Sequence, residues 1–297
     1  MDVPITPTPG APVATPGAVS ERSQARRETL SVLLRRPAFV IGTIVITGWI
    51  ICAVLGERIT PYDPINSFSE GHLPPSPEHL FGTDRIGRDV LSRVMVGSRD
   101  VLIVAPLAAV LGVIAGTLLG LIMGYYRGLV DDVLSRIVEA FLALPVILVA
   151  LLTLVVLGTS PLVVVFVVGI LFAPIVARTV RSAVLSEREL DYVTAARIRG
   201  ESGGFILSRE IFPNVLGPTV VEMTVRFGYA IFTVATLSFL GVGLQPPSPD
   251  WGLSISEEYK NMIAGTWWPT LFPALAIAST VVAVNLIADS LQSVLNE

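Results

Sequence analysis

The sequence is short of the residues that most catalytic and metal sites require. It has a single cysteine, Cys52, which excludes a disulfide framework and a cysteine-based metal site. Its one lysine, Lys260, lies in Glu-Glu-Tyr-Lys-Asn, which excludes the Gly-x-x-x-x-Gly-Lys-Ser/Thr loop that binds nucleotide phosphates. The two histidines, His72 and His79, have no close ligand spacing, so no metal site is expected. If ATP drives this protein, another chain hydrolyses it.

Charged residues are also scarce. They make up 15% of the 297 residues, against about 25% in an ordinary globular chain. Hydrophobic residues reach 52%, and the mean hydropathy is +0.72. The 20 basic and 24 acidic residues are nearly balanced, so nucleic acid is not an expected partner. The apolar residues occur in long blocks, and the composition therefore predicts a polytopic protein of the lipid bilayer.

Six apolar segments are long enough to cross a membrane. A helix rises 1.5 Å per residue, so about 20 residues cover roughly 30 Å of hydrocarbon. Pro145 and Pro174 interrupt the third and fourth segments, where neighbouring helices can satisfy the freed carbonyls. The predicted fold is all-α, with membrane-spanning helices near residues 39–56, 101–124, 137–157, 161–180, 217–244 and 269–290.

The N-terminal region predicts a tail followed by an uncleaved helix. Residues 1–34 are rich in Pro, Ala, Thr and Arg and have no apolar periodicity, so we expect a disordered tail. Arginines then precede an apolar stretch of about 18 residues, which is longer than the hydrophobic part of a secretory signal. The first transmembrane helix is therefore expected within 35–56.

The distribution of basic residues predicts the orientation. Thirteen arginines lie in residues 1–36, 124–136 and 178–213, whereas 57–99 and 245–268 together hold five arginines and one lysine. Basic residues concentrate on the cytoplasmic side of membrane proteins. Both termini are therefore expected in the cytoplasm.

The two remaining segments are then extracytoplasmic. Residues 57–99 end in a run from Asp84 to Arg99 that predicts an amphipathic helix, and 245–268 form an outer loop. The tryptophans of the loop region are expected in an interfacial aromatic belt. Residues 100–292 are expected to form a five-helix core.

Span two has a glycine at every fourth position. This spacing places the glycines on one helix face and permits the close approach of another helix. That helix could belong to a partner subunit, but packing within the chain is the preferred interpretation, and the repeat says nothing about substrate. The helix-packing residues are Gly112, Gly116, Gly120 and Gly124.

Three charged residues lie in or near the last two spans. Glu222 and Arg226 are spaced i and i+4 at the start of span five, and charges inside a membrane usually mark function. Residues 227–244 are long enough to span alone, however. An ion pair at the cytoplasmic interface, with the arginine reaching toward water, is therefore preferred over a place in a pathway. Asp289, near the inner end of span six, is also expected at the interface.

The stretch Gly200-Glu201-Ser202-Gly203-Gly204 matches the Gly-x-Ser-x-Gly pattern of a nucleophile elbow. We reject the match because an elbow needs a strand, a helix and a nearby histidine base. Both histidines lie in the segment predicted on the other side of the membrane. No catalytic residue is therefore expected.

The cytoplasmic segment between spans four and five, residues 181–216, is the most informative part of the chain. It contains a small-residue helix face, a glycine that permits a turn, and a second short helix that a proline would end. Such a segment could form a compact knob that docks in a partner's groove. It could also be an ordinary amphipathic loop, and the residues alone leave both interpretations open.

Four stretches of this sequence resemble a known family. Thr194-Ala195-Ala196-x-x-x-Gly200, followed by Pro213, resembles the Glu-Ala-Ala loop of ABC-importer permeases. The other three are Thr60-Pro61-Tyr62-Asp63-Pro64, Phe81-Gly82-Thr83-Asp84 continuing to Arg93, and Leu237-Ser238-Phe239-Leu240-Gly241 continuing to Pro247 with Trp251-Gly252. Together they resemble the second, or C-type, permease of the dipeptide/oligopeptide/nickel importer family, from about residue 30 to the end.

Three features depart from the family pattern. The glutamate that gives the loop its name is Thr194 here, and positions before Pro213 that are hydrophobic in the family hold Glu210 and Phe212. No role of that glutamate is therefore carried over. Glu222 and Arg226 stand where apolar or neutral polar residues are expected.

The resemblance implies a type I importer fold in the plasma membrane of a prokaryote. This chain would form half of the translocation pathway, paired with a homologous permease. Cytoplasmic ATP-binding subunits would bind ATP and Mg, and an extracytoplasmic substrate-binding protein would deliver the substrate; no cofactor is expected in this chain. The implied ATPase-coupling loop contains Asp191, Tyr192, Thr194, Ala195, Ala196, Gly200, Pro213 and Asn214.

Three alternatives differ from a peptide permease. A nickel importer stays open because a binding protein can supply metal selectivity, although no His or Cys cluster lines a span. A stand-alone secondary transporter or channel would need intramembrane ion or proton sites, and only Glu222, Arg226 and Asp289 are candidates. An intramembrane enzyme would need a buried nucleophile with its base, and the sequence has none.

Overall fold

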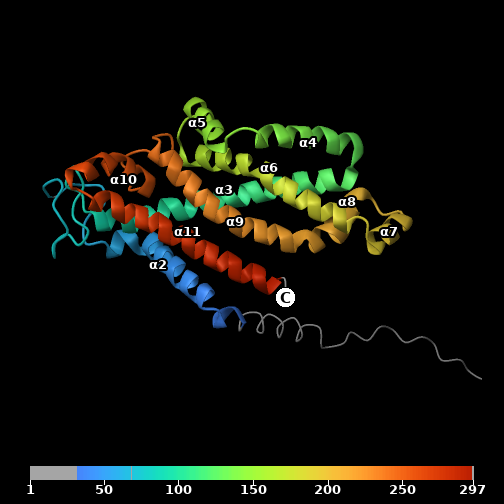
Figure 1. Cartoon of the computed structure of the whole chain (residues 1–297), viewed down its shortest axis with the longest axis horizontal. Coiled ribbons are helices and arrows are strands. Elements are labelled where there is room, and N and C mark those ends of the chain that lie inside the picture. The colour runs from blue at the N-terminus through green and yellow to red at the C-terminus, as the bar shows by residue number, and fades with distance from the viewer. Residues whose placement is uncertain (1–31, 68, 296–297) are drawn as a thin grey trace, which may run out of the picture.

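The structure is a computed structural model that describes residues 32–67 and 69–295. In these ranges the chain is helical, with one isolated bridge between Thr83 and Asp89 and no strand, so the all-α prediction is confirmed (Figure 1). The tail expected over 1–34 lies outside the described residues except for 32–34, which are helical. The helices are α2 (Pro37–Ile59), α3 (Val90–Tyr126), α4 (Gly128–Leu142), α5 (Val146–Leu157), α6 (Pro161–Glu187), α7 (Asp191–Ile198), α8 (Gly203–Phe205), η1 (Ile206–Ile211), α9 (Phe212–Phe239), α10 (Trp251–Glu258), η2 (Tyr259–Ala264) and α11 (Trp268–Leu295).

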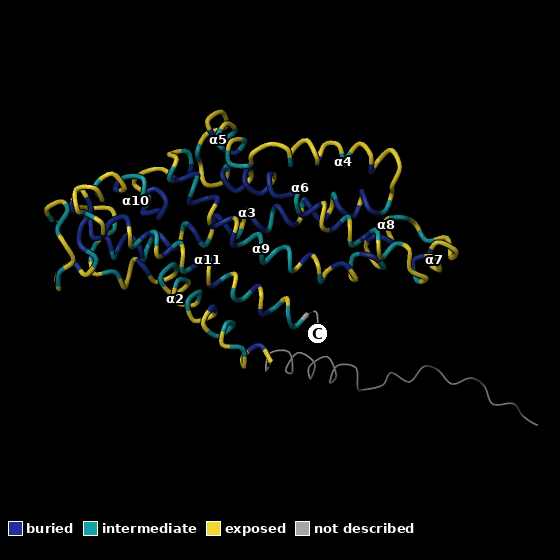
Figure 2. The backbone as a smooth tube through the Cα atoms, viewed as in Figure 1, coloured by how far each residue is buried: buried dark blue, intermediate teal, exposed yellow. Residues whose placement is uncertain are grey.

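The long helices α3 and α6 form the centre of the bundle. Both contain buried residues along most of their length, whereas the residues of α2 are mostly exposed or half-buried (Figure 2). The helix α9 packs against α3, α6 and α11, and α2 packs against α11 and α3. The helices α4 and α5 lie along the opposite side of the bundle from α2 (Figure 1). Short connections place α7 at one end of the bundle and α10 at the other.

Five helices are long and apolar enough to cross a membrane, and the count is six if the bent pair α4 and α5 is one span. The expected third span, 137–157, is therefore not a single helix: α4 and α5 meet at 88°. Pro145 explains the break, because the residue before a proline avoids the helical conformation and proline offers no N–H to the preceding turn. The helix α5 has 12 residues, about 18 Å, too few to span alone.

The expected amphipathic helix from Asp84 to Arg99 begins later and continues further. Residues 84–89 form a turn in which Gly87 has φ +82°, and α3 starts at Val90. The Asp89 carboxylate accepts a 2.8 Å hydrogen bond from the Ser92 backbone N–H, which caps the helix. Residues 90–99 are thus the first turns of α3, which runs unbroken through span two to Tyr126.

The expected fifth span also begins earlier than its apolar stretch indicates. The chain is helical from Gly203 to Phe239, so Pro213 does not end a second short helix. Proline is tolerated here because it lies in the first turn of α9, directly after the π-helical turn η1. In that turn the Phe212 backbone N–H donates to the Leu207 carbonyl, five residues back, which accommodates the change in helix register.

Candidate functional site

Residues 188–214, which we call the α7 knob, form a compact unit at one end of the bundle. Two side chains of α7, Val193 and Ala196, are fully buried in an apolar cluster with η1 and the ends of α3 and α6. The opposite face of α7 exposes Thr194 and Ala195, and at its tip the Ile198 side chain is 82% exposed. The knob therefore has an anchored face and a free face, and the free face ends in an apolar side chain.

Tyr192 links the knob to both helices that carry it. Its hydroxyl donates a 2.7 Å hydrogen bond to the Glu187 carboxylate at the end of α6. The same hydroxyl accepts from the Asn214 side chain in the first turn of α9 at 3.2 Å, and Asn214 also donates to the Glu210 carbonyl. Burial, with the Glu187 hydrogen bond, raises the pKa of Tyr192 to about 12, so the hydroxyl keeps its proton. The Tyr192 hydroxyl thereby connects α7 to both α6 and α9.

Gly200 ends α7 in the left-handed conformation. Its φ is +78°, its N–H donates to the Arg197 carbonyl, and the Glu201 N–H donates to the Ala196 carbonyl. This pair of hydrogen bonds is a Schellman motif, which favours glycine because other residues are strained at positive φ. A side chain at Gly200 would meet no atom within 4 Å. Glycine is therefore needed here for its backbone conformation.

The remaining coupling candidates take different places. Asp191 is exposed in the first turn of α7, where a negative charge suits the helix dipole. Pro213 is exposed at the start of α9. Ala196 faces the chain's own core, so the small residues at 195 and 196 do not share one surface. Adjacent positions on a helix differ by about 100°, so the two alanines point in different directions. The sequence did not indicate which of them faces the core.

The four glycines of span two all pack against α6. A methyl group added at Gly116 would lie 2.5 Å from Val176 Cβ, and one added at Gly120 would lie 2.7 Å from the Ala177 carbonyl oxygen. The same approach occurs at Gly112, opposite Gly169 and Phe172, and at Gly124, opposite Val184. The stripe thus serves packing within this chain.

Glu222 and Arg226 form an ion pair in which the Arg226 Nη2 lies 2.8 Å from the Glu222 Oε1. Their side chains are only 12% and 11% exposed. The Arg226 guanidinium lies over the ring of Phe172 in α6, with its Cζ 6.0 Å from the ring centroid, and over Tyr229 at 5.0 Å. Arg226 lies about 13 residues, or roughly 20 Å, from the end of α9 at Phe239. The two charged side chains therefore lie largely inside the protein, packed against α6.

Asp289 lies in the last turns of α11, and its residue is exposed. Asn285, one turn before it, is also exposed and lies beside α9, because a methyl added at Gly228 would be 2.9 Å from Asn285 Oδ1. The structure does not bring Asp289 into the Glu222–Arg226 pair.

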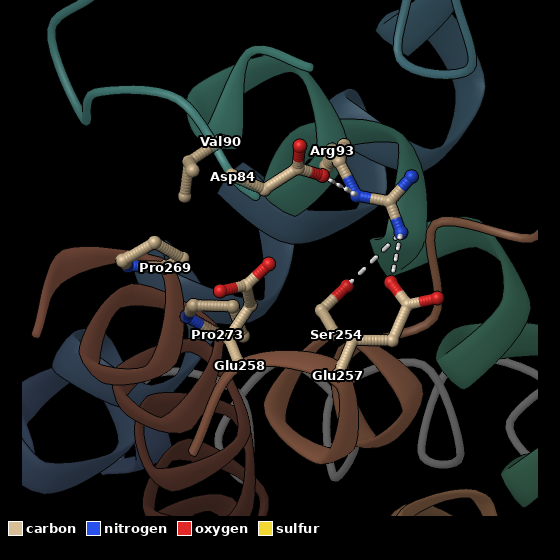
Figure 3. Close-up of a pocket in the computed structure, with 8 residues that line it drawn as sticks. All are labelled: Asp84, Val90, Arg93, Ser254, Glu257, Glu258, Pro269 and Pro273. Carbon is tan, nitrogen blue, oxygen red and sulfur yellow. Dashed lines mark hydrogen bonds and ion pairs between the residues drawn. The ribbon is translucent and has the colours of Figure 1, made fainter. Parts of the chain in front are cut away.

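The other end of the bundle carries a buried ionic cluster that sequence patterns did not reveal. We call residues 60–67, 69–93 and 245–268 the α10 cap. Arg88 donates to Asp84 at 2.6 Å and to Glu257 at 2.8 Å, and all three side chains are largely buried. Arg93 donates to the Ser254 hydroxyl at 3.3 Å and lies 3.8 Å from Asp84 and 3.9 Å from Glu257 (Figure 3).

A second set of contacts closes the cap. The fully buried Glu258 carboxylate accepts from the Arg85 backbone N–H at 2.9 Å, from Asn261 at 2.8 Å and contacts His72 Nε2 at 3.1 Å. His79 Nδ1 lies 2.9 Å from Asp89, the residue that caps α3. The contacts of Glu257 with Arg88 and of Glu258 with Arg85 and His72 join segments more than 150 residues apart, so single-sequence spacing offered no signal for Glu257 and Glu258. Removing one partner of such a buried pair typically costs about 3–5 kcal/mol.

Two tryptophans expected at a membrane interface are instead part of this cap. Trp251 is fully buried, and its Nε1 donates to the Val94 carbonyl at 2.8 Å. Trp268 Nε1 donates to the Thr83 carbonyl at 3.1 Å. The cap thus covers the ends of α3, α9 and α11. Among residues 32–67 and 69–295, no group of three or more His, Cys, Asp and Glu side chains could hold a metal ion.

Comparison with known proteins agrees with this architecture. Residues 116–297, which include the α7 knob, match the family described as the binding-protein-dependent transport system inner membrane component. The chain is 40% identical over 265 residues to a putative peptide transport system permease protein of Brucella suis, covering 89% of both chains.

Two further relatives are named as dipeptide transport system permease protein DppC. The Escherichia coli K12 protein is 40% identical over 269 residues, which cover 88% of this chain and 89% of the relative. The Bacillus subtilis protein is 34% identical over 256 residues, which cover 86% and 80%. The chain therefore belongs to the family of binding-protein-dependent transport system inner membrane components, and it is a multi-pass membrane permease rather than an enzyme.

Proposed function

We propose that this chain is a permease subunit of an ATP-driven importer of dipeptides or oligopeptides. The observation that carries the proposal is the α7 knob: Tyr192 ties it to α6 and α9, and it presents Ile198 to a partner. The names of the relatives, peptide and dipeptide transport permeases, support the substrate class. A homologous second permease supplies the other half of the pathway.

In this proposal the α7 end of the bundle is cytoplasmic, as are both termini, and the α10 cap is extracytoplasmic. The excess of arginine in 124–136 and 178–213 supports this orientation. Partner ATPase subunits, which bind ATP and Mg, dock on the knob. The extracytoplasmic substrate-binding protein docks on the α10 cap, whose buried ion pairs keep its shape.

The knob converts a movement of the ATPase subunits into a movement of two helices. When the ATPase subunits close, they displace α7, and the Glu187–Tyr192–Asn214 hydrogen bonds pull the ends of α6 and α9 with it. The permease halves then open outward and accept the peptide. Hydrolysis in the partners returns α7, and the halves open inward.

An Ile198→Ser variant tests the docking surface. Ile198 and Leu129 are both exposed apolar side chains at the α7 end, 82% and 83% exposed, but Leu129 lies in α4, outside the knob. In the reconstituted transporter we expect Ile198→Ser to reduce ATPase stimulation by the loaded binding protein at least fivefold. Leu129→Ser is the matched control and should keep it. Equal stimulation in the two variants would contradict docking at the α7 tip.

Substrate class is tested by uptake in proteoliposomes containing the permease pair, the ATPase subunits and the binding protein. We expect ATP-dependent accumulation of a labelled dipeptide and none of Ni²⁺. Accumulation of Ni²⁺ without peptide would replace this proposal with a nickel importer. Accumulation of peptide without ATPase subunits would identify a secondary transporter.

A further inference from the structure

The helix α9 presents a stripe of residues that the described part of the chain leaves partly or fully exposed. We call these residues the α9 stripe; their spacing of three or four places them on one helix face. They are Pro218, Glu222, Val225, Tyr229, Phe232 and Thr236. The exposed residues of α2, by contrast, are mainly apolar and include Ile41, Ile44, Ile51 and Val54. A lipid-facing surface suits α2, whereas the charge and hydroxyl groups of the α9 stripe do not suit lipid.

Only one edge of the Glu222–Arg226 pair is open. In the described part of the chain, the buried Glu222 Oε1 pairs with Arg226 Nη2 at 2.8 Å, and the buried Arg226 Nε has no hydrogen-bond partner. Glu222 Oε2 and Arg226 Nη1 are not among the buried unpaired atoms, and no hydrogen bond or ion pair joins them to another described residue, so they form the open edge. A negative and a positive edge thus lie side by side on the α9 surface.

Polar residues of α6 lie between this pair and the α7 end. Arg226 lies over the buried Phe172, and the exposed Thr179 and Ser186 follow Phe172 at intervals of seven on the same face of α6. Thr179 and Ser186 line a hollow of about 870 Å³ together with Arg178 and Ser182 and with apolar residues that include Leu142 and Ile175. Arg178 is exposed, and no ion pair or hydrogen bond joins it to another residue in the described ranges. A face with this polarity along a membrane-spanning bundle suits a hydrated passage.

We propose that Glu222 and Arg226 form a charge-balanced contact site for the peptide on the wall of the translocation pathway. The open guanidinium edge of Arg226 attracts carboxylates of the passing peptide, and the open carboxylate edge of Glu222 attracts its ammonium groups. Because the pair is neutral as a whole, peptides of either net charge pass with similar ease. This inference rests on the proposed function as a peptide importer.

The test is a competition between an acidic and a basic peptide of equal length in one proteoliposome sample. Glu222→Gln leaves Arg226 without its counter-charge, so the ratio of acidic to basic peptide uptake should rise at least fivefold. Arg226→Gln should lower that ratio at least fivefold. The double Gln variant should return it to within twofold of wild type. The binding protein is the same throughout, so its own preference cancels from the comparison.

A second ion pair provides the matched control. Arg99 and Glu57 lie 3.4 Å apart with exposed side chains, outside the α7 knob and the α10 cap, and Arg99→Gln and Glu57→Gln should leave the uptake ratio unchanged. If the Glu222 and Arg226 variants copurify with their partners but reduce both peptides equally, the pair serves packing between subunits and the proposal fails. Unchanged uptake in both single variants also overturns it, because the pair would then face lipid.

A labelling experiment covers the case in which the glutamine variants do not assemble. In a Cys52→Ala background, a cysteine at Tyr229 should react with a water-soluble thiol reagent at least tenfold faster than a cysteine at Ile44, and peptide transport should slow that reaction. Equally slow reaction at the two positions would overturn the proposal. If the wild-type transporter accumulates no peptide at all, the proposed function fails instead, which separates the two outcomes.

Discussion

At Gly200 the backbone conformation, and not the space around it, requires glycine. The position has φ +78° and open space where a side chain would point. Small residues in this segment therefore have separate causes: Ala196 fits a buried contact, Ala195 lies on the free face, and Gly200 closes the helix. Substitutions at the three positions should fail for different reasons.

We expect Gly200→Val to weaken coupling, whereas Gly200→Asn keeps most of it. A non-glycine residue in the left-handed conformation costs about 1–2 kcal/mol, and asparagine tolerates it best. The measurement is ATPase stimulation by the loaded binding protein, with hydrogen exchange of residues 191–200 to report whether α7 frays. A Gly200→Val protein with normal stimulation and normal exchange would contradict the role assigned to the Schellman motif.

Asp250 should make the α10 cap sensitive to pH. It is fully buried at the N-terminus of α10, where it accepts from the Leu253 backbone N–H at 2.8 Å, and burial raises the pKa of Asp250 to about 6. The unfolded carboxyl group has a pKa of about 3.9. The folded state therefore binds the proton more tightly, and this contribution to stability, complete below about pH 4, is lost as pH rises through about 6.

Asp250→Asn should remove this pH dependence, because asparagine keeps the oxygen that caps α10 and carries no charge. We expect the thermal midpoint of the variant, followed by tryptophan fluorescence near Trp251, to rise relative to wild type between pH 4.5 and 7. A constant difference between the two proteins across that range would show that Asp250 does not titrate there.

At the scale of helices, the contact between α3 and α6 depends on the absence of side chains on one α3 face. Gly116 and Gly120 bring the backbone of α3 against Val176, Ala177 and Val180 of α6. Valine suits the α6 side because it is rigid and compact. The two helices therefore pack closely against each other along this face.

A Gly116→Leu change should disrupt the contact between α3 and α6. Even a methyl at this position would lie 2.5 Å from Val176 Cβ, and overpacking typically costs about 1–3 kcal/mol. We expect less than a tenth of the wild-type yield of assembled transporter. Gly48→Leu in α2 is the matched control, since nothing lies within 4 Å of its added Cβ, and its yield should stay near wild type. Equal yields for both variants would contradict the packing role.

At the scale of the whole molecule, the bundle has two unlike ends. The α10 cap is held by buried ion pairs between segments far apart in sequence, whereas the α7 knob is held by an apolar cluster and the hydrogen bonds of Tyr192. In the proposed function, the α10 cap receives substrate and the α7 knob receives the mechanical signal of the ATPase subunits.

The orientation of these ends is open to direct measurement. In a Cys52→Ala background, cysteine at Leu80, which is 60% exposed in the α10 cap, should react with a membrane-impermeant reagent in intact cells. Cysteine at Ile198, 82% exposed, should react only after permeabilisation. The reverse pattern would invert the proposed topology and remove the ATPase contact from the knob.

Periodicity and composition by themselves determined the all-α class, the long spans and the segment that forms the knob, because apolar runs and turn residues act locally along the chain. Tertiary structure alone decided the rest. It placed Ala196 inward, buried Trp251 and brought Glu257 and Glu258 to the arginines of residues 85–93. It also packed the Glu222–Arg226 pair against Phe172 of α6, with both charged side chains largely buried. These outcomes depend on which helix faces meet, and spacing along one chain carries no information about the neighbouring helix.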